Sequence, residues 1–263
     1  LGAKVTVLKT GDASEDAQTA ALEGYIRETQ PELVLFSGTQ IGKDLAPRLA
    51  QRFDAGCVTD VTVIDKTDSG LEFVRPAYGG TILERLFVSG PIRFATVRSG
   101  SFEKPEAAEG SVEEKDMPFA EDILKAKVLD TAKEITEAID LEGADVIVTG
   151  GRGMGDAEGF KLVEELAALL GGVVGASRPA IEAGWASRAH QVGQSGKIVA
   201  PRLYIACGVS GAMQHVSGIM GSKYIVAINK DEAASIFDIA DVGIVGDVKE
   251  ILPLLIEEIK KRK

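Results

Sequence analysis

Cysteine and histidine are scarce in this sequence, since its 263 residues contain only two of each. Cys57 and Cys207 lie far apart in apolar surroundings, so they give neither a disulfide framework nor the ligand spacing of a metal centre. His190 and His215 are too few for a typical zinc site. We therefore expect no structural disulfide and no metal.

Basic charge and long apolar runs are lacking as well. Lysine and arginine number 29 against 40 acidic residues, which gives a formal net charge of −11. Nucleic acids and anionic membranes are bound through clustered basic side chains, so neither is predicted as a partner. No apolar run approaches the ~20 residues of a membrane span, so membrane insertion is not expected.

The chain opens at Leu1-Gly2-Ala3 without a methionine or a signal-like segment, so its native N-terminus is expected to lie elsewhere. A reducing compartment is compatible with the two distant cysteines. We predict the cytoplasm, with the mitochondrial matrix as the alternative.

Residues 1–100 are predicted to form an N-terminal α/β domain with a mixed sheet. Strands are expected at 4–8, 33–36, 58–64, 72–75, 81–88 and 94–98, and helices at 15–27 and 41–53. Pro47 is expected to limit the second helix. From Ser99 to Pro118 the composition shifts to small and charged residues, which predicts a linker at 101–118.

Residues 119–263 are predicted to form the second domain. Helices are expected at 120–138, 158–170 and 248–261, and strands at 145–149, 173–176, 203–207, 224–228 and 243–245. Apolar strands that alternate with amphipathic helices indicate a doubly wound parallel sheet with both faces covered, a Rossmann-like architecture.

Each of these five strands is followed at once by polar or glycine residues. The turns are 150–153, 177–178, 208–211, 229–231 and 246–247. Any one turn has a structural explanation, because loops and helix caps need Gly, Asn and Asp. Five turns around one crevice favour a ligand, because open α/β sheets bind ligands at the carboxyl ends of their strands.

The residue types narrow the ligand to a phosphate-bearing molecule. The turn 208–211 leads into a helix through His215, which suits a phosphate at a helix N-terminus. Asn229 and Asp247 suit ribose hydroxyls or an adenine edge, although either can equally cap the next helix.

A standard dinucleotide fingerprint is absent, because Asp156 stands where G-x-G-x-x-G needs its last glycine. Ser177 and Arg178 follow the second strand in place of the acidic residue that binds the ribose of NAD, which leaves NADP open. No nucleophile arrangement or carboxylate pair stands out, so hydrolysis is not suggested.

Several segments closely resemble the alpha subunit of electron transfer flavoproteins. They are GGRGMGDAEGFKLVEELA, GASRPAIEAGW, HQVGQSGKIVAP, LYIACGVSGAMQH, AINKD and DVGIVGD, with looser likeness in IGKDLAPRLA, RPAYGG and TVRSGSF. The resemblance implies an FAD held mainly by the second domain and a beta subunit that carries AMP or a second flavin. It also implies an electron carrier rather than a substrate-transforming enzyme.

The donor implied by the resemblance is a dehydrogenase of the acyl-CoA type, as in fatty acid oxidation, or one linked to NADH. A downstream acceptor receives the electrons, with or without electron bifurcation. Two alternatives stay open, namely an NADP-dependent oxidoreductase subunit and a nucleotide-binding regulatory module without a redox role.

Carried onto this chain, the family's cofactor-binding positions fall mostly on the strand ends. They are Arg152, Ser177, Arg178, Val192, Gly193, Gln194, Ser195, Ser210, Gly211, Ala212, Met213, Gln214, His215, Asn229 and Asp247. The resemblance implies that Arg178 lies by the isoalloxazine and His215 near its C2 carbonyl, both favouring an anionic reduced flavin. The alternative for Arg178 is a surface ion pair.

The sequence departs from the family pattern at two places. The family often has Thr where this chain has Ser195, the residue expected to hydrogen-bond flavin N5, so the donor is less fixed in rotamer. Family members also carry a further strand and helix before the position of Leu1, so the first domain is expected to be incomplete at its N-terminus.

Overall fold

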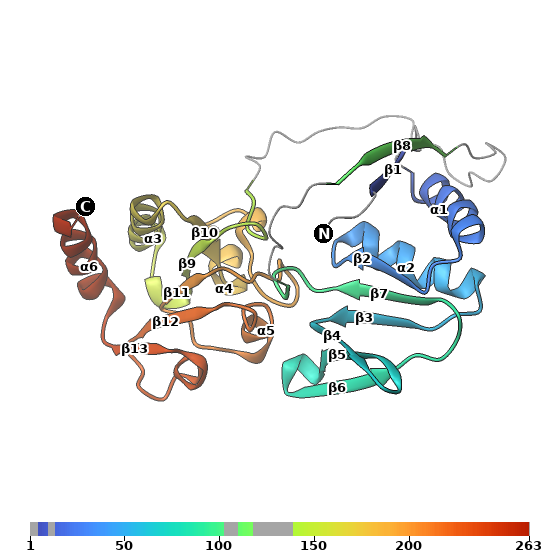
Figure 1. The fold of residues 1–263 in the computed structure, drawn as a ribbon. Helices are drawn as coiled ribbons and strands as arrows, with labels where there is room; N and C mark the ends of the chain where they lie inside the picture. Colours follow the sequence, from blue (N-terminus) through green and yellow to red (C-terminus); the bar gives the residue numbers. More distant parts are fainter. Residues whose placement is uncertain (1–4, 10–13, 103–109, 118–138, 263) are drawn as a thin grey trace. The chain divides into compact units, whose positions relative to one another are not determined.

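The computed structural model describes residues 5–9, 14–102, 110–117 and 139–262 of the chain. The chain divides into two compact units, Leu1–Glu134 and Ile135–Lys263 (Figure 1). Each unit combines helices with strands, as the α/β prediction required.

The described part of the first unit forms three small sheets. A parallel sheet has the strand order β2-β7-β3, an antiparallel sheet has the order β4-β5-β6, and β1 pairs in parallel with β8. The elements are β1 (Val5–Lys9), α1 (Glu15–Thr29), β2 (Leu33–Ser37), α2 (Gln40–Arg52), β3 (Cys57–Val61), β4 (Val63–Thr67), β5 (Gly70–Ala77), the 3₁₀ turn η1 (Tyr78–Gly80), β6 (Ile82–Phe87), β7 (Arg93–Val97) and β8 (Val112–Asp116). The mixed pairing predicted for this half of the chain is confirmed.

The continuous strand predicted over 58–64 is wrong, because Thr62 separates β3 from β4 and the pairing of β3 with β7 is irregular between Val58 and Val61. Asp60 has a left-handed φ of 63°, and its N–H donates to the Thr96 hydroxyl at 2.8 Å. Its carboxylate accepts from Nε of Arg98, also at 2.8 Å. Asp tolerates this conformation better than most residues. The chain therefore leaves the parallel sheet as β3 and enters the antiparallel sheet as β4.

Two further differences concern α2 and the predicted linker. The helix α2 continues through Pro47 to Arg52, because Leu45 and Leu49 are buried and packing outweighs the lost hydrogen bond. Within the predicted linker, Val112–Asp116 forms β8 in parallel register with β1. Its side chains are largely charged and exposed. The strand is therefore defined by its backbone pairing with β1 and not by an apolar sequence pattern.

The second unit is built on one parallel sheet with the strand order β10-β9-β11-β12-β13. Its elements are β9 (Val146–Gly150), the 3₁₀ turn η3 (Arg152–Met154), α3 (Ala157–Leu170), β10 (Val173–Ala176), α4 (Arg178–Glu182), the 3₁₀ turn η4 (Arg188–His190), β11 (Leu203–Cys207), α5 (Met213–Val216), β12 (Tyr224–Asn229), the 3₁₀ turn η5 (Ser235–Ile239), β13 (Val242–Val245) and α6 (Val248–Arg262). This architecture confirms the predicted doubly wound sheet. The helix predicted at 120–138 lies outside the described residues.

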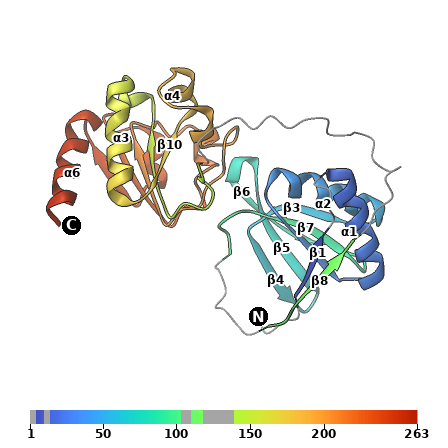
Figure 2. The same cartoon turned by 90° about the horizontal axis from the view of Figure 1, so that it is seen from above.

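Both faces of this sheet are covered. On one face α3 and α6 pack together against the strands through a core that includes Phe160 and Leu252 (Figure 2). On the other face Ile147 and Tyr204 belong to a second core with Ile236. Successive residues of a strand point to opposite faces, so the apolar runs of β9 and β11 supply both cores.

The thiol of Cys207 is fully buried at the carboxyl end of β11. Burial disfavours the thiolate and raises the pKa of Cys207 to about 12.

Among the helices that the structure describes, none has the length and apolarity needed to cross a bilayer.

Replacing Phe160 by alanine is expected to lower the free energy of unfolding of the second unit by about 3–5 kcal/mol, because the ring is 1% exposed and its loss opens a cavity. Trp185, the chain's single tryptophan, packs against the same core, so its fluorescence during urea unfolding measures the change. Leu254→Ala is the control, since Leu254 lies on α6 with 67% exposure and should change stability little. Equal losses in the two variants would contradict the core assignment.

Candidate functional site

A cavity of about 960 Å³ lies at the carboxyl ends of β9, β10, β11 and β12. The chain passes from β9 to β10 on one side of the sheet and then to β11 on the other, so β9 and β11 flank the point where the strand order reverses. Arg152 and Gly153 after β9 line the cavity together with Gly208 and Ser210 after β11. This is the position at which doubly wound sheets bind their ligands.

Glycines bring the loops after β9 and β11 into direct contact. The Gly153 N–H donates to the Gly208 carbonyl at 2.9 Å. A Cβ on Gly153 would lie 2.7 Å from the Gly208 Cα, and Gly208 has a left-handed φ of 63°. No other residue type fits both loops without strain.

The loop from Val192 to Lys197 forms another wall of the cavity. Its ends are joined by the bond from the Gly193 N–H to the Lys197 carbonyl, and the Gln194 N–H donates to the Gln214 carbonyl at 2.7 Å. A Cβ on Gly193 would lie 2.8 Å from that same Gln214 carbonyl oxygen. The loop is therefore held closely against the segment that carries His215.

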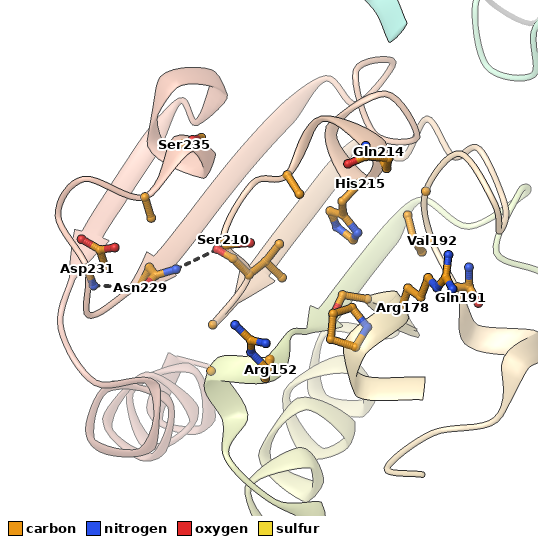
Figure 3. A pocket seen from close by; sticks show the side chains of 18 of the residues that line it. Arg152, Arg178, Gln191, Val192, Ser210, Gln214, His215, Asn229, Asp231 and Ser235 are labelled. Atoms are coloured by element: carbon orange, nitrogen blue, oxygen red, sulfur yellow. Dashed lines mark hydrogen bonds between the residues drawn. The ribbon is translucent and has the colours of Figure 1, made fainter. Parts of the chain in front are cut away.

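His215 lines the cavity from α5 and is 7% exposed (Figure 3). Its Nε2 lies 2.9 Å from the hydroxyl of the fully buried Tyr204. Burial lowers the pKa of His215 to about 4, with a smaller opposing effect from the Val192 backbone, and raises the pKa of Tyr204 above its ordinary value. Both groups are therefore neutral near pH 7.

The protonation of Tyr204 bears on which nitrogen of His215 can serve a ligand. When the phenol donates to Nε2, the neutral imidazole carries its own proton on Nδ1. That nitrogen is buried and makes no hydrogen bond of full geometry within the described residues, although the Val192 backbone lies close enough to raise the pKa of the ring. The pair can thus present a donor to a ligand carbonyl.

Two arginines and Lys230 supply the positive charge of the cavity. Arg152 and Arg178 face the same space from η3 and α4 (Figure 3). Nε of Arg178 donates to Glu182 at 2.7 Å, one helical turn further on, with both side chains more than half exposed. The surface ion pair considered from the sequence is thus present, and Arg178 lines the cavity as well.

Asn229 and Asp247 turn out to differ in position. The Asn229 amide donates to the Val209 carbonyl at 2.8 Å and accepts from the Asp231 N–H at 3.0 Å, so it joins two lining loops (Figure 3). Asp247 accepts from the Lys249 N–H at 2.8 Å at the start of α6, which is the capping alternative.

Most of the residues singled out from the sequence line this cavity. They are Arg152, Ser177, Arg178, Val192, Gly193, Gln194, Ser195, Ser210, Ala212, Gln214, His215 and Asn229, whereas Gly211, Met213 and Asp247 lie outside the lining. Pro179, Gln191 and the 233–235 segment also line the cavity and were not predicted from the sequence. Adjacency to Val192 and to the Asn229 turn was the signal that could have found them.

A parallel sheet with a glycine-lined crevice at its switch point defines a Rossmann-like domain that binds a nucleotide cofactor. Residues 140–220 match the electron transfer flavoprotein FAD-binding domain, and residues 2–122 match the electron transfer flavoprotein domain. The chain belongs to the electron transfer flavoprotein alpha-subunit family, and the cofactor of its second unit is FAD.

Individual relatives agree with these family matches. The electron transfer flavoprotein subunit alpha of Thermoanaerobacterium thermosaccharolyticum is 46% identical, with 92% of this chain and 75% of the relative covered. That of Bacillus subtilis is 44% identical, with 97% and 78% covered. The acryloyl-CoA reductase electron transfer subunit beta of Anaerotignum propionicum is 38% identical, with 94% and 77% covered.

The cavity residues fit FAD. The Ser177 hydroxyl and Nδ1 of His215 are buried there without a hydrogen-bond partner within the described residues, an arrangement that costs about 1–3 kcal/mol per group unless a ligand pairs with them. Arg152 and Arg178 offer cations to a pyrophosphate or a reduced flavin, and the volume lies near the top of the ~300–1,000 Å³ range of cofactor pockets.

In the cofactor-free protein, acidification from pH 7 to pH 5 is expected to lower the free energy of unfolding by about 2 kcal/mol through His215. Its pKa is about 4 when folded against 6.5 ordinarily, so between these values the unfolded chain binds more protons and the folded state loses stability as the pH falls. Urea unfolding at several pH values measures this loss. The loss of stability on acidification should vanish in His215→Asn and persist in His190→Asn. The reverse pattern would contradict the assignment of this loss to His215.

Gly208→Ala is expected to destabilise the second unit and to reduce FAD uptake. The new Cβ would add strain at a left-handed φ and would lie 2.8 Å from the Gly153 backbone. Gly171→Ala is the matched control, because Gly171 has a similar φ of 66° but open space around it. We expect about 1 kcal/mol of loss for Gly171→Ala and at least ~2 kcal/mol more for Gly208→Ala, from urea unfolding. Similar losses would show that the loop contact contributes little.

Proposed function

We propose that the cavity holds one FAD and that this chain, beside a beta subunit, relays electrons from a dehydrogenase to a downstream acceptor. The observation that carries the proposal is the cavity at the β9/β11 switch point, where Arg178 and His215 line one space. Bound FAD supplies the capacity to accept electrons and pass them on.

In this proposal the lining residues divide the work of holding and tuning the cofactor. The guanidinium of Arg178 stabilises negative charge on the reduced isoalloxazine, because its positive charge lines the cavity that holds the ring. Nδ1 of His215 donates to the C2 carbonyl, and the Ser195 hydroxyl donates to N5. Arg152 and the N–H groups of the 209–212 loop bind the pyrophosphate.

The partners are proposed from the relatives. The A. propionicum relative is named as an electron transfer subunit of acryloyl-CoA reductase, and the two others as alpha subunits of electron transfer flavoproteins. We propose a heterodimer with a beta subunit that carries AMP or a second FAD, in the cytoplasm, with a dehydrogenase of the acyl-CoA or NADH-linked type as donor. Counting FAD and AMP in the purified heterodimer separates a simple carrier, with one FAD and AMP, from a bifurcating one with two FAD.

Arg178→Ala is expected to lower the reduction potential of the bound FAD by on the order of 60 mV, a tenfold change in a one-electron equilibrium. The reason is that the variant removes the cation which stabilises the reduced, negatively charged ring. Stepwise dithionite reduction of the heterodimer in equilibrium with a reference dye of known potential, followed by visible absorption, measures the potential.

Arg188→Ala is the matched control, because Arg188 is an exposed arginine on η4 outside the cavity lining. It should leave the potential unchanged. Equal potentials for Arg178→Ala and the unmodified protein would remove the role given to Arg178. A colourless heterodimer that fails to take up added FAD would overturn the proposed function itself.

A further inference from the structure

Gln191 is a buried polar residue at the wall of the cavity. It is 6% exposed and lines the same cavity as Val192 and Arg178 (Figure 3). Its side-chain Nε2 donates to Oγ of Ser195 at 2.9 Å. Ser195, by contrast, is exposed to the cavity. The buried amide of Gln191 thus hydrogen-bonds the exposed hydroxyl of Ser195.

The position of Gln191 is fixed by its backbone. Its N–H donates to the Arg188 carbonyl, and its carbonyl accepts from the Lys197 N–H at 2.8 Å. The residue also forms a bridge with Ala176 at the end of β10. A Cβ on Gly196 would lie 2.3 Å from the Gln191 carbonyl oxygen and 3.0 Å from its Cγ, so the glycine leaves room for this side chain.

The direction of the Gln191–Ser195 bond decides what Ser195 can do. An amide NH₂ is only a donor, whereas a hydroxyl carries one proton and can accept as well. Because Ser195 accepts from Gln191, its own proton is not used in that bond and stays available to a ligand. A serine hydroxyl otherwise samples three staggered rotamers, and the bond to Gln191 selects among them.

We propose that Gln191 is a positioning residue that orients the Ser195 hydroxyl so that it donates its proton into the cavity. This inference rests on the proposed function, in which the proton goes to flavin N5. Gln191 acts through Ser195 and does not itself contact the reacting ring. Its removal should therefore weaken the hydrogen bond at N5 while the cavity still accepts FAD.

The test uses the full-length heterodimer loaded with FAD that is ¹⁵N-labelled at N5. The two readouts are the FAD dissociation constant and the ¹⁵N chemical shift of N5, which reports hydrogen bonding at that atom. Gln191→Met is expected to weaken FAD binding about three- to tenfold, the effect of one directed hydrogen bond, and to move the N5 shift toward that of Ser195→Ala. Gln51→Met, an exposed glutamine on α2, should change neither readout.

Double variants separate positioning from a merely structural role. In the Ser195→Ala background, Gln191→Met should add no further loss, because the hydroxyl that it orients is already gone. In the Ser195→Thr background most of the loss should be recovered, because a β-branched side chain restricts its own rotamer. A loss of the same size with Ser195→Ala, or no recovery with Ser195→Thr, overturns the inference.

A second variant covers failure of Gln191→Met to fold, which urea unfolding followed at Trp185 detects. Gln191→Glu keeps the shape but can only accept, so Ser195 donates to it and the N5 shift should move in the same direction as for Gln191→Met. An N5 shift that stays unchanged in a folded Gln191 variant overturns this inference alone. Absence of FAD binding by the unmodified heterodimer overturns the proposed function instead.

Discussion

The hydrogen bond from the Gly153 N–H to the Gly208 carbonyl joins the ends of β9 and β11, and the site depends on it. A parallel sheet alone would leave these loops several ångströms apart across the ladder. Because neither glycine has a side chain, the loops meet backbone to backbone and bring Arg152 and Ser210 to the same crevice. The two joined loops together form one wall of the cavity at the switch point.

The other walls of the cavity are joined to one another by further hydrogen bonds. Asn229 ties the loop after β12 to Val209, and Gln194 ties the 192–197 loop to the segment before His215. Both of these hydrogen bonds use backbone or amide groups, so they leave Arg152, the Ser177 hydroxyl and Nδ1 of His215 available to a ligand. The site therefore combines a rigid backbone frame with a few uncommitted polar groups, two of which are buried and unpaired within the described residues.

Much of this could be predicted from the sequence, because the second unit follows local rules. Its strands are apolar runs that feed two cores, and each strand ends in a turn whose composition stands out from the run before it. The strand-end residues Arg152, Ser177 and Asn229 were predicted as site residues, and all three line the cavity. Parallel pairing places such ends at one edge of a sheet whatever the details of packing.

What could not be predicted depends on contacts between distant residues. The irregular backbone at Asp60 within β3 is held by Thr96 and Arg98, which the pattern of 58–64 cannot reveal. The strand β8 exists through its backbone ladder to β1, and its charged side chains resemble a linker. Gln191 was not predicted, because its role depends on the direction of its side-chain amide, which is set by tertiary contacts.

The burial of Cys207 has a practical consequence for work on this protein. Its thiol is inaccessible, and burial strongly disfavours the thiolate. Alkylating reagents that need a thiolate will therefore not react with Cys207 at neutral pH. Cys57 lies in the other unit, is only partly buried and is the one other cysteine of the sequence. With Cys57 replaced, a single cysteine introduced on the surface of the second unit becomes a selective attachment point for a fluorophore or spin label.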